Sequence, residues 1–140
     1  MSVLFPVALI VEGAFGLGLL LLPGPVLAPM GVVLDEPAAL LARLYGSALI
    51  AFAILLWTAR RAEDPALREG VTLTLFAYFV VSGALLLVAQ LRQQMNARGW
   101  IVVALHALFA AWFGYFVVRG APAPRKAHSD GPASPASPDA

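Results

Sequence analysis

Four stretches of the 140-residue chain are apolar enough and long enough to cross a lipid bilayer. They cover about residues 3–22, 38–58, 70–91 and 99–118. A bilayer core about 30 Å thick needs roughly 20 residues of helix, because each residue adds about 1.5 Å along the axis. The pattern therefore predicts an all-α fold, an integral membrane four-helix bundle.

The composition also indicates that the chain lies in a membrane. Hydrophobic residues make up 61% of the chain and charged residues 12%, whereas soluble domains average about 45–50% and about 25%. A soluble domain of this size could not hide that much apolar surface, because much of a small protein faces solvent. The surplus is expected to face membrane lipid.

Helix-breaking and capping residues separate the four stretches. Proline and glycine at 23–25 end the first, and an Asp-Glu-Pro segment at 35–37 places acidic residues and a first-turn proline at the start of the second. Asp-Pro at 64–65 repeats that arrangement before the third stretch, and Arg-Gly at 119–120 closes the fourth. A signal peptide begins with Lys or Arg before its apolar segment, and no such residue precedes the first stretch. We therefore expect the first stretch to be a retained helix.

These helix-breaking and capping residues divide the chain into two regions. Residues 1–119 are predicted to form the transmembrane domain. Residues 120–140 are rich in Ala, Pro and Ser and carry no aromatic residue, so we expect a disordered tail with nothing to bury.

The distribution of basic residues predicts the orientation. An even number of crossings places both termini and the middle loop on one side of the membrane. That side would hold six Lys or Arg residues and the other side two; the six are Arg60, Arg61, Arg68, Arg119, Arg125 and Lys126, and the two are Arg92 and Arg98. The positive-inside rule then predicts cytoplasmic termini. The expected location is the bacterial inner (plasma) membrane, crossed several times.

Three ionisable residues lie within the predicted spans, and each is costly in hydrocarbon. Glu12 lies ~15 Å below the outer end of its span, Arg43 ~8 Å and His106 ~10 Å, from the helical rise. Because an arginine stem is long, all three could meet in the outer half of the bundle. We predict that they point inward and form a buried polar cluster.

Two interpretations of such a cluster remain open. Glu12 and Arg43 can form an interhelical ion pair that sets helix register, with one hydrogen bond at His106. Alternatively, the three side chains bind a polar head group or pass a proton. Tyr78 and Ser82 share one face of the third helix and are candidate ligand contacts, although hydrogen bonding to helix carbonyls is their ordinary role.

Other chemistries find little support. The net charge of +1 provides no basic field for nucleic acid, and the absence of cysteine excludes disulfides and thiolate zinc sites. We expect no metal, because Glu12 and His106 fall short of the usual three or four ligands. No catalytic residue and no cofactor is expected.

Three short segments, 18–23 (GLLLLP), 29–32 (PMGV) and 41–46 (LARLYG), carry a family resemblance. In them the sequence resembles the DoxX-like superfamily of small four-helix bacterial membrane proteins, and most of all an uncharacterised group whose second helix opens with Arg-x-Tyr-Gly. It implies a single four-helix bundle, and for some members a link to membrane oxidoreductase systems or quinone-coupled sulfur chemistry. Arg43 and Tyr45 are the matching positions, whereas a Gly-Arg pair usual in the third helix is replaced by Gly83-Ala84.

Two functions are therefore expected. The first is a non-enzymatic accessory or structural subunit of a membrane complex, or a homodimer acting through helix contacts. The second is binding or transport of a lipid-soluble small molecule, such as a quinone or lipid, through Glu12, Arg43 and His106.

Overall fold

The computed structural model of the protein describes residues 3–120, and these are helical apart from the connecting segments. The elements in chain order are α1 (Leu4–Leu21), α2 (Pro23–Leu27), the 3-10 helix η1 (Ala28–Met30), α3 (Glu36–Arg61), α4 (Pro65–Leu91) and α5 (Gly99–Gly120). Within this part of the chain there is no strand. The predicted tail lies, from residue 121 on, outside the described residues.

The predicted capping residues begin the helices. The Asp35 side chain accepts a hydrogen bond of 2.8 Å from the Ala38 amide at the start of α3, and Asp64 accepts one of 2.9 Å from the Ala66 amide at the start of α4. Each aspartate satisfies an amide that has no partner inside the helix. The helices therefore start where the acidic residues and the following prolines indicated.

Four of the helices, α1, α3, α4 and α5, are long and apolar enough to cross a membrane. Large apolar side chains remain exposed on each of them, for example Ile10, Leu41, Leu85 and Ile101. Such surface is unfavourable in water and favourable against lipid tails. The chain is an all-α, multi-pass membrane protein.

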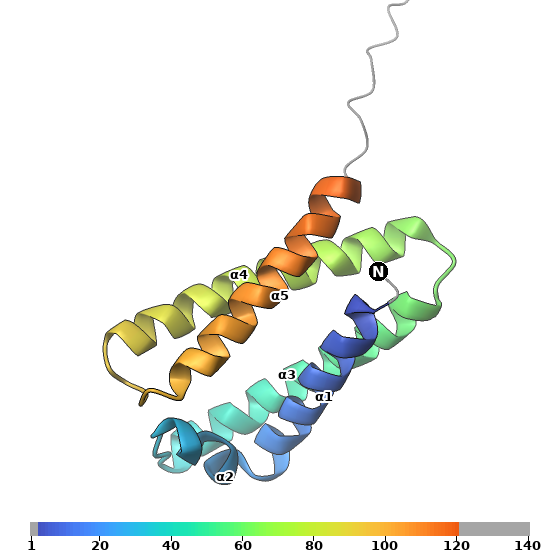
Figure 1. Ribbon diagram of the computed structural model, residues 1–140. Coiled ribbons are helices and arrows are strands. Elements are labelled where there is room, and N and C mark those ends of the chain that lie inside the picture. The colour runs from blue at the N-terminus through green and yellow to red at the C-terminus, as the bar shows by residue number, and fades with distance from the viewer. Residues whose placement is uncertain (1–2, 121–140) are drawn as a thin grey trace, which may run out of the picture.

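The four long helices are arranged as two antiparallel pairs (Figure 1). Helix α1 packs along α3, and α4 packs along α5, while contacts between the pairs are sparse. Both ends of the described chain lie at the same end of the bundle as the short α3–α4 turn (Figure 1). We call this end of the bundle the terminal end. The opposite end, which holds segments 22–35 and 92–98, is called the loop end.

Close backbone approach holds the first pair together. A carbon atom added at the Cα of Gly46 would lie 2.7 Å from the Gly16 carbonyl oxygen and 2.7 Å from the Leu20 amide nitrogen. Small residues at such crossings allow van der Waals contact between helix backbones, which is a main source of stability in membranes. The α1–α3 contact therefore depends on glycine at this position.

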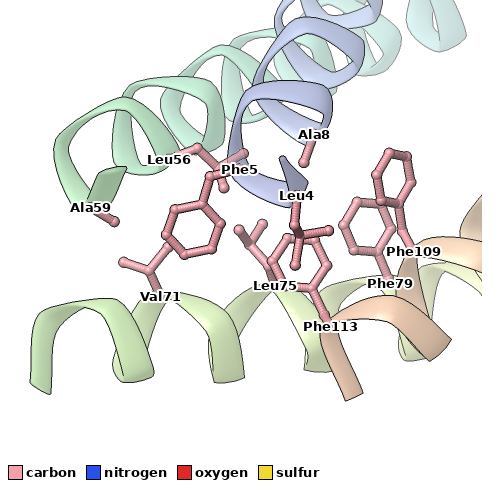
Figure 2. Close-up of a cluster of buried hydrophobic side chains, with 10 residues drawn as sticks. All are labelled: Leu4, Phe5, Ala8, Leu56, Ala59, Val71, Leu75, Phe79, Phe109 and Phe113. Atoms are coloured by element: carbon pink, nitrogen blue, oxygen red, sulfur yellow. The ribbon is translucent and has the colours of Figure 1, made fainter. Parts of the chain in front are cut away.

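An apolar core joins the two pairs near the terminal end (Figure 2). Phe5 of α1 lies with its ring centroid 6.3 Å from that of Phe113 of α5, and Phe113 stacks at 5.6 Å on Phe79 of α4. Leu56 and Ala59 bring α3 into the same cluster. All four long helices thus meet here in aromatic and aliphatic contacts.

At the loop end the connection is polar and small. Asn96 of the α4–α5 turn donates through its backbone nitrogen to the Met30 carbonyl (2.8 Å) and through its side-chain Nδ2 to the Pro29 carbonyl (3.0 Å). Its side chain also covers Gly31, whose positive φ of 80° favours glycine. The two helix pairs are thereby joined at both ends.

We expect Gly46→Ala to destabilise the protein by about 1–3 kcal/mol, because the added methyl group meets backbone atoms that cannot move aside. Thermal unfolding in detergent micelles would measure the loss. The matched control is Gly70→Ala on α4, where an added carbon meets nothing within 4 Å, so its midpoint should be unchanged or slightly raised. Equal midpoints for both variants would contradict the assigned α1–α3 contact.

Candidate functional site

Glu12 lies on the buried stripe of α1. This stripe includes Leu4, Ala8, Glu12 and Gly16, spaced four residues apart so that they share one helix face. Only 5% of the Glu12 surface is exposed. No hydrogen bond or ion pair joins its carboxyl to another side chain within residues 3–120. The structure confirms the inward orientation predicted for Glu12 and leaves its carboxyl without a partner.

Arg43 does not join the cluster, so the expected Glu12–Arg43 ion pair is absent from the described part of the chain. Its side chain is exposed on α3. Residues two apart lie about 200° apart around a helix, so Arg43 and Tyr45 project from opposite sides. Helical rise gives the depth of Arg43 but not the direction in which its side chain projects. From its exposed position, an arginine can extend toward the membrane surface.

Tyr45, and not Arg43, is the residue of α3 whose polar group bonds across the two helix pairs. Although 39% of its surface is exposed, its hydroxyl group is hydrogen-bonded to that of Tyr78. This bond joins α3 to α4, and therefore one helix pair to the other. Tyr45 was not among the predicted site residues; its place in the Arg-x-Tyr-Gly segment was the signal that could have found it.

Tyr78 lies at the centre of the polar side chains inside the bundle. Its ring lies 4.8 Å from that of Phe52 on α3, 5.0 Å from that of Phe79 and 6.3 Å from that of His106 on α5. The phenol oxygens of both Tyr45 and Tyr78 are within electrostatic reach of the Glu12 carboxyl. Side chains from all four long helices therefore surround one polar region.

His106 is buried on the α5 side of this region, with 8% of its surface exposed. Its Nδ1 atom lies 2.9 Å from the Val102 carbonyl oxygen, one turn earlier in α5. Its Nε2 atom is buried and has no hydrogen-bond partner in the described residues. The ring of Phe79 lies 5.6 Å away at 70° and forms an apolar wall.

Ser82 makes the ordinary hydrogen bond of a helix serine. Its hydroxyl donates to the Tyr78 carbonyl at 2.6 Å, as Thr74 donates to the Gly70 carbonyl at 2.9 Å. The proton of Ser82 is therefore in use, although its oxygen can still accept. Ser82 belongs to the third-helix face near the cluster and has the backbone role that the sequence favoured.

Together these residues make a candidate polar binding site. We define the polar cluster as Glu12, Tyr45, Tyr78 and His106, and this name is used below. In the described residues there is no group of three or more His, Cys, Asp or Glu side chains that could hold a metal. The cluster offers a carboxyl group, two linked phenols and an imidazole nitrogen, enclosed by Phe52 and Phe79. Such groups can bind the polar end of an amphipathic molecule.

Removing the Tyr78 hydroxyl should destabilise the protein, because the Tyr45 hydroxyl loses its partner across the two pairs. We expect Tyr78→Phe to cost about 1 kcal/mol, measured by unfolding in detergent. Arg43→Gln is the control, with a change under about 0.5 kcal/mol, since an exposed side chain has no partner to lose. A loss for Arg43→Gln as large as that for Tyr78→Phe would place the arginine inside the bundle.

Comparison with known proteins gives one family. The profile described as "Domain of unknown function (DUF8292)" matches residues 7–123, which is well over half of the 140-residue chain. The chain belongs to the DUF8292 family. No curated protein and no solved structure matches it.

Proposed function

We propose that this member of the DUF8292 family is a non-enzymatic membrane protein that binds the polar end of a lipid-soluble molecule between its two helix pairs. The observation that carries the proposal is the buried His106 Nε2 atom on α5, which has no hydrogen-bond partner in the described residues. The buried side chain of Glu12 on α1, for which no ion pair is found in residues 3–120, accompanies it. The two groups lie on different helix pairs, and the His106 ring lies 6.3 Å from that of Tyr78.

Burying these two groups costs free energy. A buried polar atom without a hydrogen bond costs about 1–3 kcal/mol, and an ionisable side chain inside a membrane costs more. A structural ion pair would offset that cost, but Arg43 does not supply one. A ligand with a polar end would supply the missing hydrogen bonds.

The arrangement of helices also favours a site here. The core at the terminal end and the hydrogen bonds of Asn96 at the loop end hold the pairs together, whereas contacts between pairs are otherwise few. The resemblance to the DoxX-like superfamily remains an expectation, and a quinone or a lipid is the ligand class it suggests.

The test compares wild type with a double variant, Glu12→Gln with His106→Phe, and with the control Arg43→Gln. Each protein is purified in mild detergent and analysed by native mass spectrometry for bound small molecules. We expect wild type and Arg43→Gln to retain the same lipid-soluble molecule, and the double variant to lose at least about 90% of it. Equal retention by a folded double variant, or no bound molecule in any sample, would instead favour a structural subunit.

We further propose that the protein lies in the bacterial inner membrane with both termini in the cytoplasm. The support is the excess of arginine at the terminal end, where Arg60 and Arg61 both stack on Trp57 and Arg119 stacks on Tyr115. Arginine with interfacial aromatic residues is typical of a cytoplasmic membrane boundary.

Single cysteines can test this orientation, because the chain contains no natural cysteine. We expect Gln94→Cys at the loop end to react with a membrane-impermeant maleimide in spheroplasts. Glu63→Cys in the α3–α4 turn should react only after permeabilisation. Both positions are exposed, so the reverse pattern would place the termini outside.

A further inference from the structure

We infer that the ligand of the polar cluster is a hydrogen-bond donor, an amphipathic alcohol or phenol whose hydroxyl group donates to the Nε2 atom of His106. This inference rests on the proposed function, and it specifies the chemical class of the ligand. It follows from the one hydrogen bond that His106 makes and from the surroundings of its free nitrogen.

The hydrogen bond of His106 assigns the proton on its ring. The Val102 carbonyl oxygen, 2.9 Å from Nδ1, can only accept. The Nδ1 atom must therefore carry the proton. In a neutral imidazole the other nitrogen then has a lone pair and no hydrogen.

The buried position of His106 keeps the ring neutral. It is 92% buried in a membrane-spanning helix, and no carboxylate forms an ion pair with it among the described residues. A second proton would place an unpaired charge in hydrocarbon, which is far more costly than an unpaired nitrogen. The Nε2 atom is thus a buried acceptor that lacks a donor.

The other polar groups do not determine the ligand class. A carboxyl group such as that of Glu12 accepts hydrogen bonds in either protonation state and donates one when protonated, and in the Tyr45–Tyr78 pair one hydroxyl donates while the other keeps a free proton. These groups can bind many polar atoms. The free lone pair of His106 accepts a donor only, so it distinguishes a hydroxyl from an ether or a carbonyl.

The apolar surroundings describe the rest of the ligand. The rings of Phe79 and Tyr78 lie 5.6 Å and 6.3 Å from the imidazole, and Phe52 lies against Tyr78 from α3. Aromatic side chains at these separations favour a flat or aliphatic body beside the hydroxyl. A phenol with an alkyl chain has both parts.

The experiment uses two probes that differ only in the donor, 4-nonylphenol and 4-nonylanisole, with the full chain in lipid nanodiscs. Binding is measured by titration, and the nitrogen resonances of ¹⁵N-labelled histidine report on the ring. The chain has two histidines, so His128→Gln isolates the signals of His106. We expect an unprotonated Nε2 resonance that shifts with the phenol, and binding of the phenol about tenfold or more tighter than that of the anisole. In His106→Phe the two probes should bind equally.

The outcomes separate this inference from the proposed function. Equal binding of both probes to wild type, or a protonated Nε2 in the free protein, would overturn the donor assignment and leave ligand binding intact. If neither probe binds while wild type still retains a natural molecule, the hydroxyl class is wrong. If neither probe binds and no molecule is retained, both proposals fail. The wild-type measurements test whether the ligand must be a hydrogen-bond donor even if His106→Phe does not fold.

Discussion

The hydrocarbon core of a bilayer cannot hydrogen-bond to a polar group, and the rest of this structure depends on that constraint. Backbone amides and carbonyls within the bilayer must find partners inside the protein, and helices satisfy this requirement along their whole length. Serine and threonine side chains in α4 follow the same rule by donating to carbonyls of the preceding turn. Against this background, the buried Nε2 atom of His106, which has no partner in the described residues, and the buried ionisable side chain of Glu12 are exceptions that require an explanation.

The division into two helix pairs explains how such exceptions can persist. Within the first pair, Gly16 and Gly46 bring the backbones into contact and exclude any larger group. Between the pairs, aromatic rings at the terminal end and Asn96 at the loop end hold the bundle together. The polar cluster lies in the region between these two attachments.

The comparison of Arg43 with Tyr45 shows how position on a helix decides which side chain faces the other helix pair. Both residues belong to the Arg-x-Tyr-Gly segment, and both lie at similar depth. Only Tyr45 faces the second helix pair, where it bonds to Tyr78. The charge of Arg43 made it the more conspicuous candidate in the sequence, but a guanidinium can avoid burial by extending to the membrane surface. The tyrosine, with its apolar ring and a single hydroxyl, suits a partly buried position.

The sequence by itself determined the all-helical fold, the four long apolar helices and their starting residues. These features follow from local properties, namely apolar length, capping aspartates and prolines, which act over a few residues of the chain. It also identified Glu12, His106 and Tyr78 as residues near the interior. Only the tertiary structure decided that the helices form two pairs, that Arg43 points away and that Tyr45 links the pairs. Helix rotation and pairing depend on contacts between residues far apart in the chain, and hydropathy carries almost no information about them when every helix face is apolar.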